Sequence, residues 1–130
     1  MCVLIAAHRD LALKVARDIA DRDRTRSGMR VLDCDALEPA AVRVALADSF
    51  VPEAQTVPGC GTLLLREVHA LDAQTQTLLA DLLASAKLTS GGPRVIASTS
   101  ASLFDRVRSG QFDDQLFYWL NTIYMAFMEV

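Results

Sequence analysis

The amino-acid sequence predicts an α/β fold in which a five-stranded parallel sheet lies between layers of helices, as a three-layer sandwich. First, five short apolar runs of strand-like composition recur along the chain, at residues 2–6, 29–34, 62–65, 94–99 and 122–128. Second, helix-like segments separate these runs, and parallel neighbours need such long connections. Third, 130 residues with 52% hydrophobic and 22% charged side chains suit a single domain over residues 1–130.

The first two connections carry helix start signals. Asp10 is predicted to cap a helix that has Leu11, Val15 and Ile19 on its buried face. Pro39 is predicted at the first position of the second helix, where the missing N–H would have had no partner inside the helix. The segment 51–61 contains two prolines and two glycines, so we predict a connection there.

The clearest helix signal follows the third apolar run. Asp72 is a predicted N-cap, and apolar or small side chains near it share one helical stripe, formed by Leu71, Thr75, Leu78, Leu79 and Leu82. Within the third run, Leu64 is expected in the central strand with both faces of the sheet covered. Gln76, beside the apolar stripe, is expected on the surface.

The last connection is expected to hold two short helical segments. Residues 103–107 predict one turn of helix, and Phe112, Leu116 and Leu120 recur at four-residue spacing. On a helical wheel Trp119 falls near these three residues, which favours a place in the core. Tryptophan is also enriched at interfaces between proteins, so a contact surface is the alternative for Trp119.

Charge and cysteine content exclude several function classes. The net charge is −3 and the isoelectric point is near 5.2, whereas a phosphate-binding face needs excess positive charge. We therefore expect no direct binding of nucleic acid. The three cysteines are far apart in apolar surroundings, which favours a reducing, cytoplasmic location over a disulfide framework or a metal site. No apolar stretch is long enough to cross a membrane, and no secretory leader is recognisable.

Four blocks of sequence, in order, resemble the AAA+ domain of sigma-54-dependent transcription activators. They are GTLLLREVHAL from Gly61, QTQTLL from Gln74, RVIASTS from Arg94 and QFDDQLFYWLN from Gln111. The corresponding family patterns include GTLFLDEI, RVIAATN and RFREDLYYRLN. The resemblance implies the α/β core of a P-loop NTPase, and it covers nearly the whole chain. It does not extend to the helical lid that follows the fifth strand in the family, so we expect no lid.

The phosphate-binding loop of this family, GESGTGKE, has no counterpart here. The matching segment holds Ala7, His8 and Arg9, with no glycine, and Lys14 comes so late that it is expected inside the first helix. Without glycines the backbone amides cannot easily form the concave nest that holds a phosphate. His8 is expected to be a residue of the loop or helix entry rather than a metal ligand, because no second ligand has a matching spacing. No metal site is predicted.

The family's Asp-Glu pair at the end of the third strand, which serves magnesium and the attacking water, is Arg66 and Glu67 here. A cation at the magnesium position repels the metal, and we expect these two side chains to be solvated. Ser100 stands where the family has an asparagine that senses the γ-phosphate. Two arginines that reach a neighbouring subunit's nucleotide correspond to Asp113 and Trp119. The family's GAFTGA loop would fall within 51–60, which lacks it.

The resemblance and the departures together predict no catalytic residues, no cofactor and no ATPase activity. The leading hypothesis is a non-hydrolysing regulatory or protein-interaction module in bacterial transcription control, whose partner is the transcription machinery or a second copy of the chain. The alternative is an NTPase that binds magnesium nucleotide weakly, with Arg9 or Lys14 on phosphate and Glu67 as the base. A receiver-like phosphoacceptor built on Asp33 and Asp35 is disfavoured, because no acidic pair follows the first strand.

Overall fold

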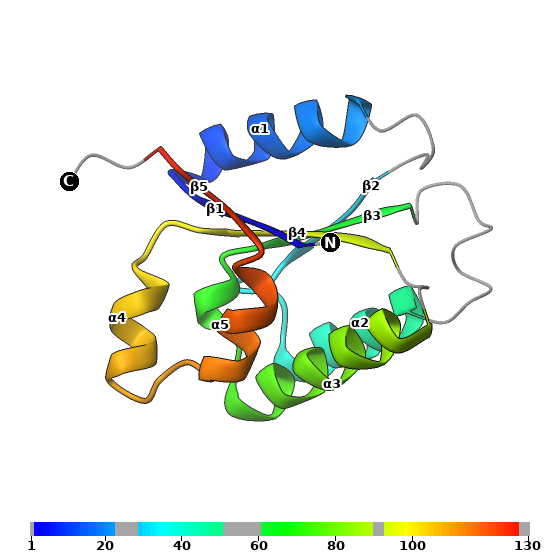
Figure 1. Ribbon diagram of the computed structural model, residues 1–130, viewed down its shortest axis with the longest axis vertical. Helices are drawn as coiled ribbons and strands as arrows, with labels where there is room; N and C mark the ends of the chain where they lie inside the picture. The colour runs from blue at the N-terminus through cyan, green and yellow to red at the C-terminus, as the bar shows by residue number, and fades with distance from the viewer. Residues whose placement is uncertain (1, 23–28, 51–60, 90–92, 128–130) are drawn as a thin grey trace.

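The computed structural model describes residues 2–22, 29–50, 61–89 and 93–127. Its centre is a parallel sheet with the strand order β2-β3-β4-β1-β5, as Figure 1 shows. All four strand pairs are parallel, so the predicted sheet is confirmed. The strands are β1 Cys2–Ala6, β2 Met29–Asp33, β3 Thr62–Arg66, β4 Arg94–Thr99 and β5 Ile123–Ala126.

Helices cover both faces of the sheet and complete the predicted three layers. In Figure 1, α1 lies on one face, and α2, α3, α4 and α5 lie on the other. The helices are α1 Arg9–Arg22, α2 Pro39–Phe50, α3 Ala73–Thr89, α4 Leu103–Arg108 and α5 Asp114–Leu120, and a 3-10 turn, η2 Val68–Ala70, precedes α3. Pro39 therefore opens α2 as predicted.

The two sheet faces bury separate apolar clusters, because side chains along each strand alternate between the faces. On the α1 face, Val3, Ile5, Leu64 and Ile96 pack with alanines of α1. The other cluster, under α2, α3 and α5, contains Leu4, Leu63, Leu65 and the predicted residues Phe112, Leu116 and Leu120. Leu64 is 0% exposed, but β4, not β3, is the central strand, so that part of the prediction is wrong.

The first helix differs from its prediction. It begins at Arg9, so Asp10 lies in the first turn rather than at the cap position. Its buried residues are Ala12 and Ala16, while Leu11 is 39% exposed. The alanines allow the helix to approach the sheet closely. Val15 and Ile19 are half-buried and pack against the same cluster, as predicted, so the prediction is wrong for Leu11.

The cap predicted for α3 is confirmed, whereas the surface position predicted for Gln76 is wrong. The Thr75 backbone N–H donates to Asp72 Oδ1 at 2.8 Å, and hydrogen bonds from Thr75 lower the pKa of the Asp72 carboxyl. Gln76 is 5% exposed. Its Nε2 donates to the carbonyls of Leu71 and Gln111, and its Oε1 accepts from the Asp113 backbone N–H at 2.7 Å.

The connection predicted at 51–61, with the position of the missing GAFTGA loop, falls almost wholly outside the described residues, as does the end of the fifth predicted strand at 128. Among the residues that the structure describes, no helix is long and apolar enough to span a membrane.

Candidate functional site at the carboxyl ends of the strands

The turn between β1 and α1 is a short, direct connection between Ala6 and Arg9. Ala7 is buried and continues the strand, since its N–H donates to the Thr99 carbonyl at 3.1 Å. His8 is exposed, as expected for a loop residue, and its carbonyl accepts the first helical hydrogen bond from Ala12 at 2.8 Å. In the described chain, positive φ occurs at Glu67 and Gly110 but nowhere in this turn. The alternating backbone of an anion nest is therefore missing.

The two positively charged side chains predicted near the phosphate position have different environments. Lys14 is exposed and lies within α1, as predicted. Arg9, at the start of α1, forms a hydrogen-bonded ion pair with Asp35 and lies 3.7 Å from Asp33 Oδ1. The hydrogen bond to Asp35 is the main cause that raises the pKa of Arg9. The Arg9 guanidinium thus has anionic partners within the protein.

Arg66 completes this cluster from the neighbouring strand. Its Nη1 lies 3.1 Å from Asp33 Oδ1, and the side chain of Arg66 is only 15% exposed. Asp33 and Arg66 are partners in the register of β2 and β3, which places both side chains at one edge of the sheet. Asp33 Oδ1 contacts its two arginines as ion pairs, and no described residue forms an aligned hydrogen bond to this oxygen.

Glu67 is buried beside this ion-pair cluster in a strained backbone conformation. It is 5% exposed and has φ 57° and ψ 51°, the left-handed region that side chains other than glycine seldom adopt. The Ser100 hydroxyl donates to Glu67 Oε2 at 2.6 Å. The solvated pair predicted for Arg66 and Glu67 is therefore wrong. β3 is an interior strand, and Ser100, which follows its neighbour β4, contacts the Glu67 carboxylate directly.

His69 joins Glu67 to the end of β4. Its Nδ1 lies 2.9 Å from Thr99 Oγ1, and its Nε2 lies 3.7 Å from Glu67 Oε2. Burial is the main cause that lowers the pKa of His69, while the negative charge of Glu67 opposes this shift. Thr99 Oγ1 also donates to the Ala101 carbonyl at 2.8 Å. Four polar side chains from two strand ends thus form one connected cluster.

The two residues that stand in place of the family's arginines have structural roles. Asp113 caps α5, accepting the N–H groups of Gln115 and Leu116. Trp119 is half-buried, packs against the larger apolar cluster and stacks on Tyr118 with ring centroids 5.9 Å apart. Its contact with the cluster agrees in part with the predicted place in the core, and the contact surface stays a prediction.

Sequence reasoning did not identify Asp33 and Asp35 as partners of the arginines, nor His69 and Thr99 as parts of the cluster. One signal for the contact between Asp33 and Arg66 is present in the sequence. Both residues lie at the carboxyl ends of predicted strands, and parallel strands end at the same edge of a sheet. Of the described residues, no group of three histidine, cysteine or acidic side chains is placed to hold a metal ion. Burial raises the pKa of Cys34, which follows β2, to about 12, so its thiol stays protonated.

Comparison with known proteins identifies the family and the fold. The family model for the sigma-54 interaction domain matches residues 15–127. No curated protein sequence matches this chain. Among solved structures, NtrX from Brucella abortus in complex with ATP has a TM-score of 0.75 at 20% identity, over 96% of this chain and 32% of NtrX.

Two further structures share the fold. The P-loop NTPase domain of the sigma-54 transport activator from E. coli has a TM-score of 0.63 at 19% identity, over 99% of this chain and 83% of that domain. The RuvB Holliday junction branch migration motor of Thermotoga maritima has a TM-score of 0.66 at 14% identity, over 96% of this chain and 36% of RuvB. The chain thus spans about a third of the length of NtrX and RuvB. From the family model and the shared fold, we conclude that this chain belongs to the sigma-54 interaction domain family.

Proposed function

We propose that this chain is a non-hydrolysing member of its family and acts as a regulatory or protein-interaction module in bacterial transcription control. The observation that carries the proposal is the ion-pair cluster of Arg9, Asp33, Asp35 and Arg66. It occupies the edge of the sheet where the family resemblance places the phosphate loop and the magnesium-binding carboxylate.

Charge and geometry both argue against a magnesium nucleotide at this edge. Phosphates would have to compete with Asp33 and Asp35 for Arg9 and Arg66, and separating Arg66 from Asp33 would deprive a half-buried carboxylate of the nearer of its two arginine partners. The β1–α1 turn offers no nest of amides to offset that cost. Asp113 and Trp119 supply no positive charge to a neighbour's phosphates. Loss of such charge lowers phosphoryl-transfer rates by several orders of magnitude.

Thermal unfolding with and without Mg-ATP tests the proposal. A ligand at about 100 times its dissociation constant stabilises a protein by about 2.7 kcal/mol, which raises the Tm of a domain this size by several degrees. We expect no shift at millimolar Mg-ATP, either in the parent or in Arg66→Asp, since that substitution does not rebuild the loop. A family member that retains the glycine loop serves as the positive control. An upward shift that Lys14→Ala or Glu67→Ala abolishes would overturn the proposal.

A weak NTPase is the second candidate, because Glu67 is held in place by Ser100 and retains the identity of the family's water-activating residue. In that case Arg9 or Lys14 would bind phosphate. Release of phosphate from ATP by the purified chain, lost in Glu67→Gln and unchanged in Asp81→Asn, would favour this candidate. Asp81 is an exposed carboxylate on α3 and serves as a matched control.

Exposed aromatic residues support a protein partner, either the transcription machinery or a second copy of the chain. Tyr118 on α5 is 69% exposed and stacks on Trp119. Aromatic side chains of this kind are enriched at protein interfaces. The Tyr118–Trp119 pair is therefore the contact surface that we propose.

A further inference from the structure

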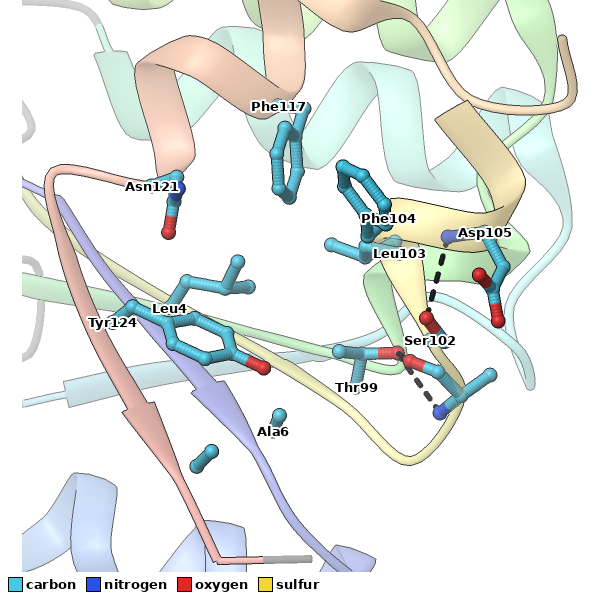
Figure 2. A pocket seen from close by; sticks show the side chains of 12 residues that line it. Leu4, Ala6, Thr99, Ser102, Leu103, Phe104, Asp105, Phe117, Asn121 and Tyr124 are labelled. Carbon is cyan, nitrogen blue, oxygen red and sulfur yellow. Dashed lines mark hydrogen bonds between the residues drawn. The ribbon is translucent and has the colours of Figure 1, made fainter. Parts of the chain in front are cut away.

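A cavity of about 700 Å³ opens on the sheet face opposite α1, away from the ion-pair cluster. Its floor is formed by side chains of β1 and β5, and its walls by α4, α5 and the loop that follows β4. In Figure 2, Phe104 and Phe117 lie on the helix side and Tyr124 lies on the strand side, with Leu4 and Leu103 also lining the space. This size and this mainly apolar lining are typical of sites for small organic ligands.

The aromatic walls are suited to a flat molecule. Phe104 and Tyr124 are 58% and 57% exposed although they line a concave site, so they retain apolar surface that a bound ring could cover. The Arg108 guanidinium lies 5.8 Å from the centroid of the Phe104 ring, a contact that helps to hold this wall in place. An aromatic ligand would therefore gain stacking or edge contacts without a large rearrangement.

The charged group that lines the cavity disfavours an anion, whereas the Arg108 guanidinium contacts the Phe104 ring and is not among the lining residues. Of the described residues that line it, only Asp105 has a charged side chain. The N-terminal end of α4 is already capped, since Ser102 Oγ accepts the Asp105 N–H at 3.3 Å. Asn121 at the C-terminal end of α5 also lines the cavity, and helix C-termini carry partial negative charge.

We propose that this cavity binds a planar, apolar small molecule that carries no negative charge. The site is distinct from the proposed nucleotide position, because it shares no residue with the ion-pair cluster, although Thr99 belongs both to the cavity lining and to the polar cluster around Glu67. A result here therefore neither supports nor contradicts the absence of ATPase activity.

Amide-detected NMR titration of the full chain tests the proposal with three probes that share a naphthalene ring and differ in charge: 1-naphthylmethylamine, 1-naphthalenemethanol and 1-naphthoate. We expect the amine and the alcohol to shift resonances of Ala6, Ala101 and Tyr124, and 1-naphthoate to bind at least about tenfold more weakly, as charge repulsion at close range would give. Asp105→Asn is expected to lower the affinity for the amine to about that for the alcohol, and to leave the affinity for the alcohol unchanged. Equal binding of all three probes, or shifts confined to other residues, would overturn the proposal.

Two variants separate the cavity from the rest of the surface. Ala126 lines the cavity, whereas Ile123 lies on the same strand and is not among the lining residues. Ala126→Trp is expected to weaken binding of the alcohol at least about tenfold, because the new ring fills part of the cavity. Ile123→Trp is expected to change this binding less than about twofold. The two variants are matched, since each puts an aromatic residue on the same edge strand, which tolerates it. Equal effects of the two variants would contradict the proposal.

If Ala126→Trp does not fold, Phe104→Ala, which removes an exposed wall residue, is expected to weaken alcohol binding several-fold. Unchanged binding would refute the site. Shifts of the cavity resonances that grow with protein concentration without any probe would assign the cavity to a second copy of the chain and would likewise refute a small-molecule site.

Discussion

Arg66 Nη1 at the end of β3 lies 3.1 Å from Asp33 Oδ1 at the end of β2, and the two residues are partners in the strand register. This pair places a cation against a carboxylate at the position where the family resemblance expects magnesium. Its strength is therefore central to the proposed loss of nucleotide chemistry.

A double-mutant cycle of Asp33→Asn and Arg66→Met is expected to give a stabilising coupling free energy of about 1 kcal/mol, because the pair is partly buried. The measurement is urea unfolding of the four proteins. The coupling should fall in about 1 M salt, since the Asp33 side chain is 36% exposed. Asp81→Asn with Arg66→Met serves as an additive control pair. A coupling indistinguishable from that control would show that the ion pair contributes nothing to stability.

Glu67→Gly is expected to be more stable than Glu67→Ala by about 1 kcal/mol. Both variants lose the hydrogen bond from Ser100, but only glycine adopts a φ of 57° without strain. Denaturant midpoints of the two variants and the parent provide the measurement. If alanine proves the more stable of the two, the left-handed conformation at this position is wrong.

Stability should depend on pH through His69. Burial lowers the pKa of His69 below its usual value of 6.5, so below that pH the unfolded chain takes up a proton that the folded chain does not. The contribution of the neutral His69 ring to the free energy of unfolding is fully present above pH 6.5 and is lost as the pH falls from 6.5 towards the lowered pKa. Glu67 and Asp35 favour the charged ring, whereas Arg106 and Arg9 oppose it.

We therefore expect the unfolding free energy of the parent to decrease between about pH 7 and pH 5.5 more than that of His69→Asn, because asparagine does not titrate. His8→Asn is the matched control, since His8 is exposed. An equal decrease in the parent and His69→Asn would rule out a role for His69 protonation.

Gln76→Ala is expected to cost more than about 2 kcal/mol, because the substitution leaves the buried Leu71 carbonyl and the Asp113 N–H without their partner. Gln74→Ala on the same helix removes an exposed side chain and is expected to change the unfolding free energy by less than about 0.5 kcal/mol. Urea unfolding compares the two. Equal costs would contradict the bridging role of Gln76.

Trp119 is the only tryptophan, so its fluorescence reports on its environment. Because it is half-buried against the core, we expect partial quenching by iodide in the monomer and stronger protection if the Tyr118–Trp119 surface forms a contact. Tyr118→Ser should weaken self-association, measured by sedimentation, and change stability by less than about 0.5 kcal/mol. A Trp119→Ala variant destabilised by more than about 3 kcal/mol with an unchanged association state would exclude the interface.

The sequence by itself determined the element types, because these depend on patterns within single segments. The unbroken apolar run at Thr62–Leu65 predicts a buried strand, the segment Arg94–Thr99 predicts another strand, and Pro39 and Asp72 are recognisable as helix starts. The four motif blocks indicate the family to which the chain belongs. The absence of glycine between Ala6 and Lys14 and the arginine at position 66 are visible in the same way.

Only the tertiary structure decided which of these residues meet. The insertion of β1 between β4 and β5 and the burial of Glu67 depend on the order of strands, which local periodicity does not encode. Asp10 and Leu11 were misassigned because the close approach of Ala12 and Ala16 to the sheet set the rotation of α1. Gln76 was misassigned for a similar reason, since its partners Gln111 and Asp113 are distant in sequence. Ion pairs and buried hydrogen bonds join groups from different elements, so their partners are defined only when the sheet register and helix packing bring those elements together.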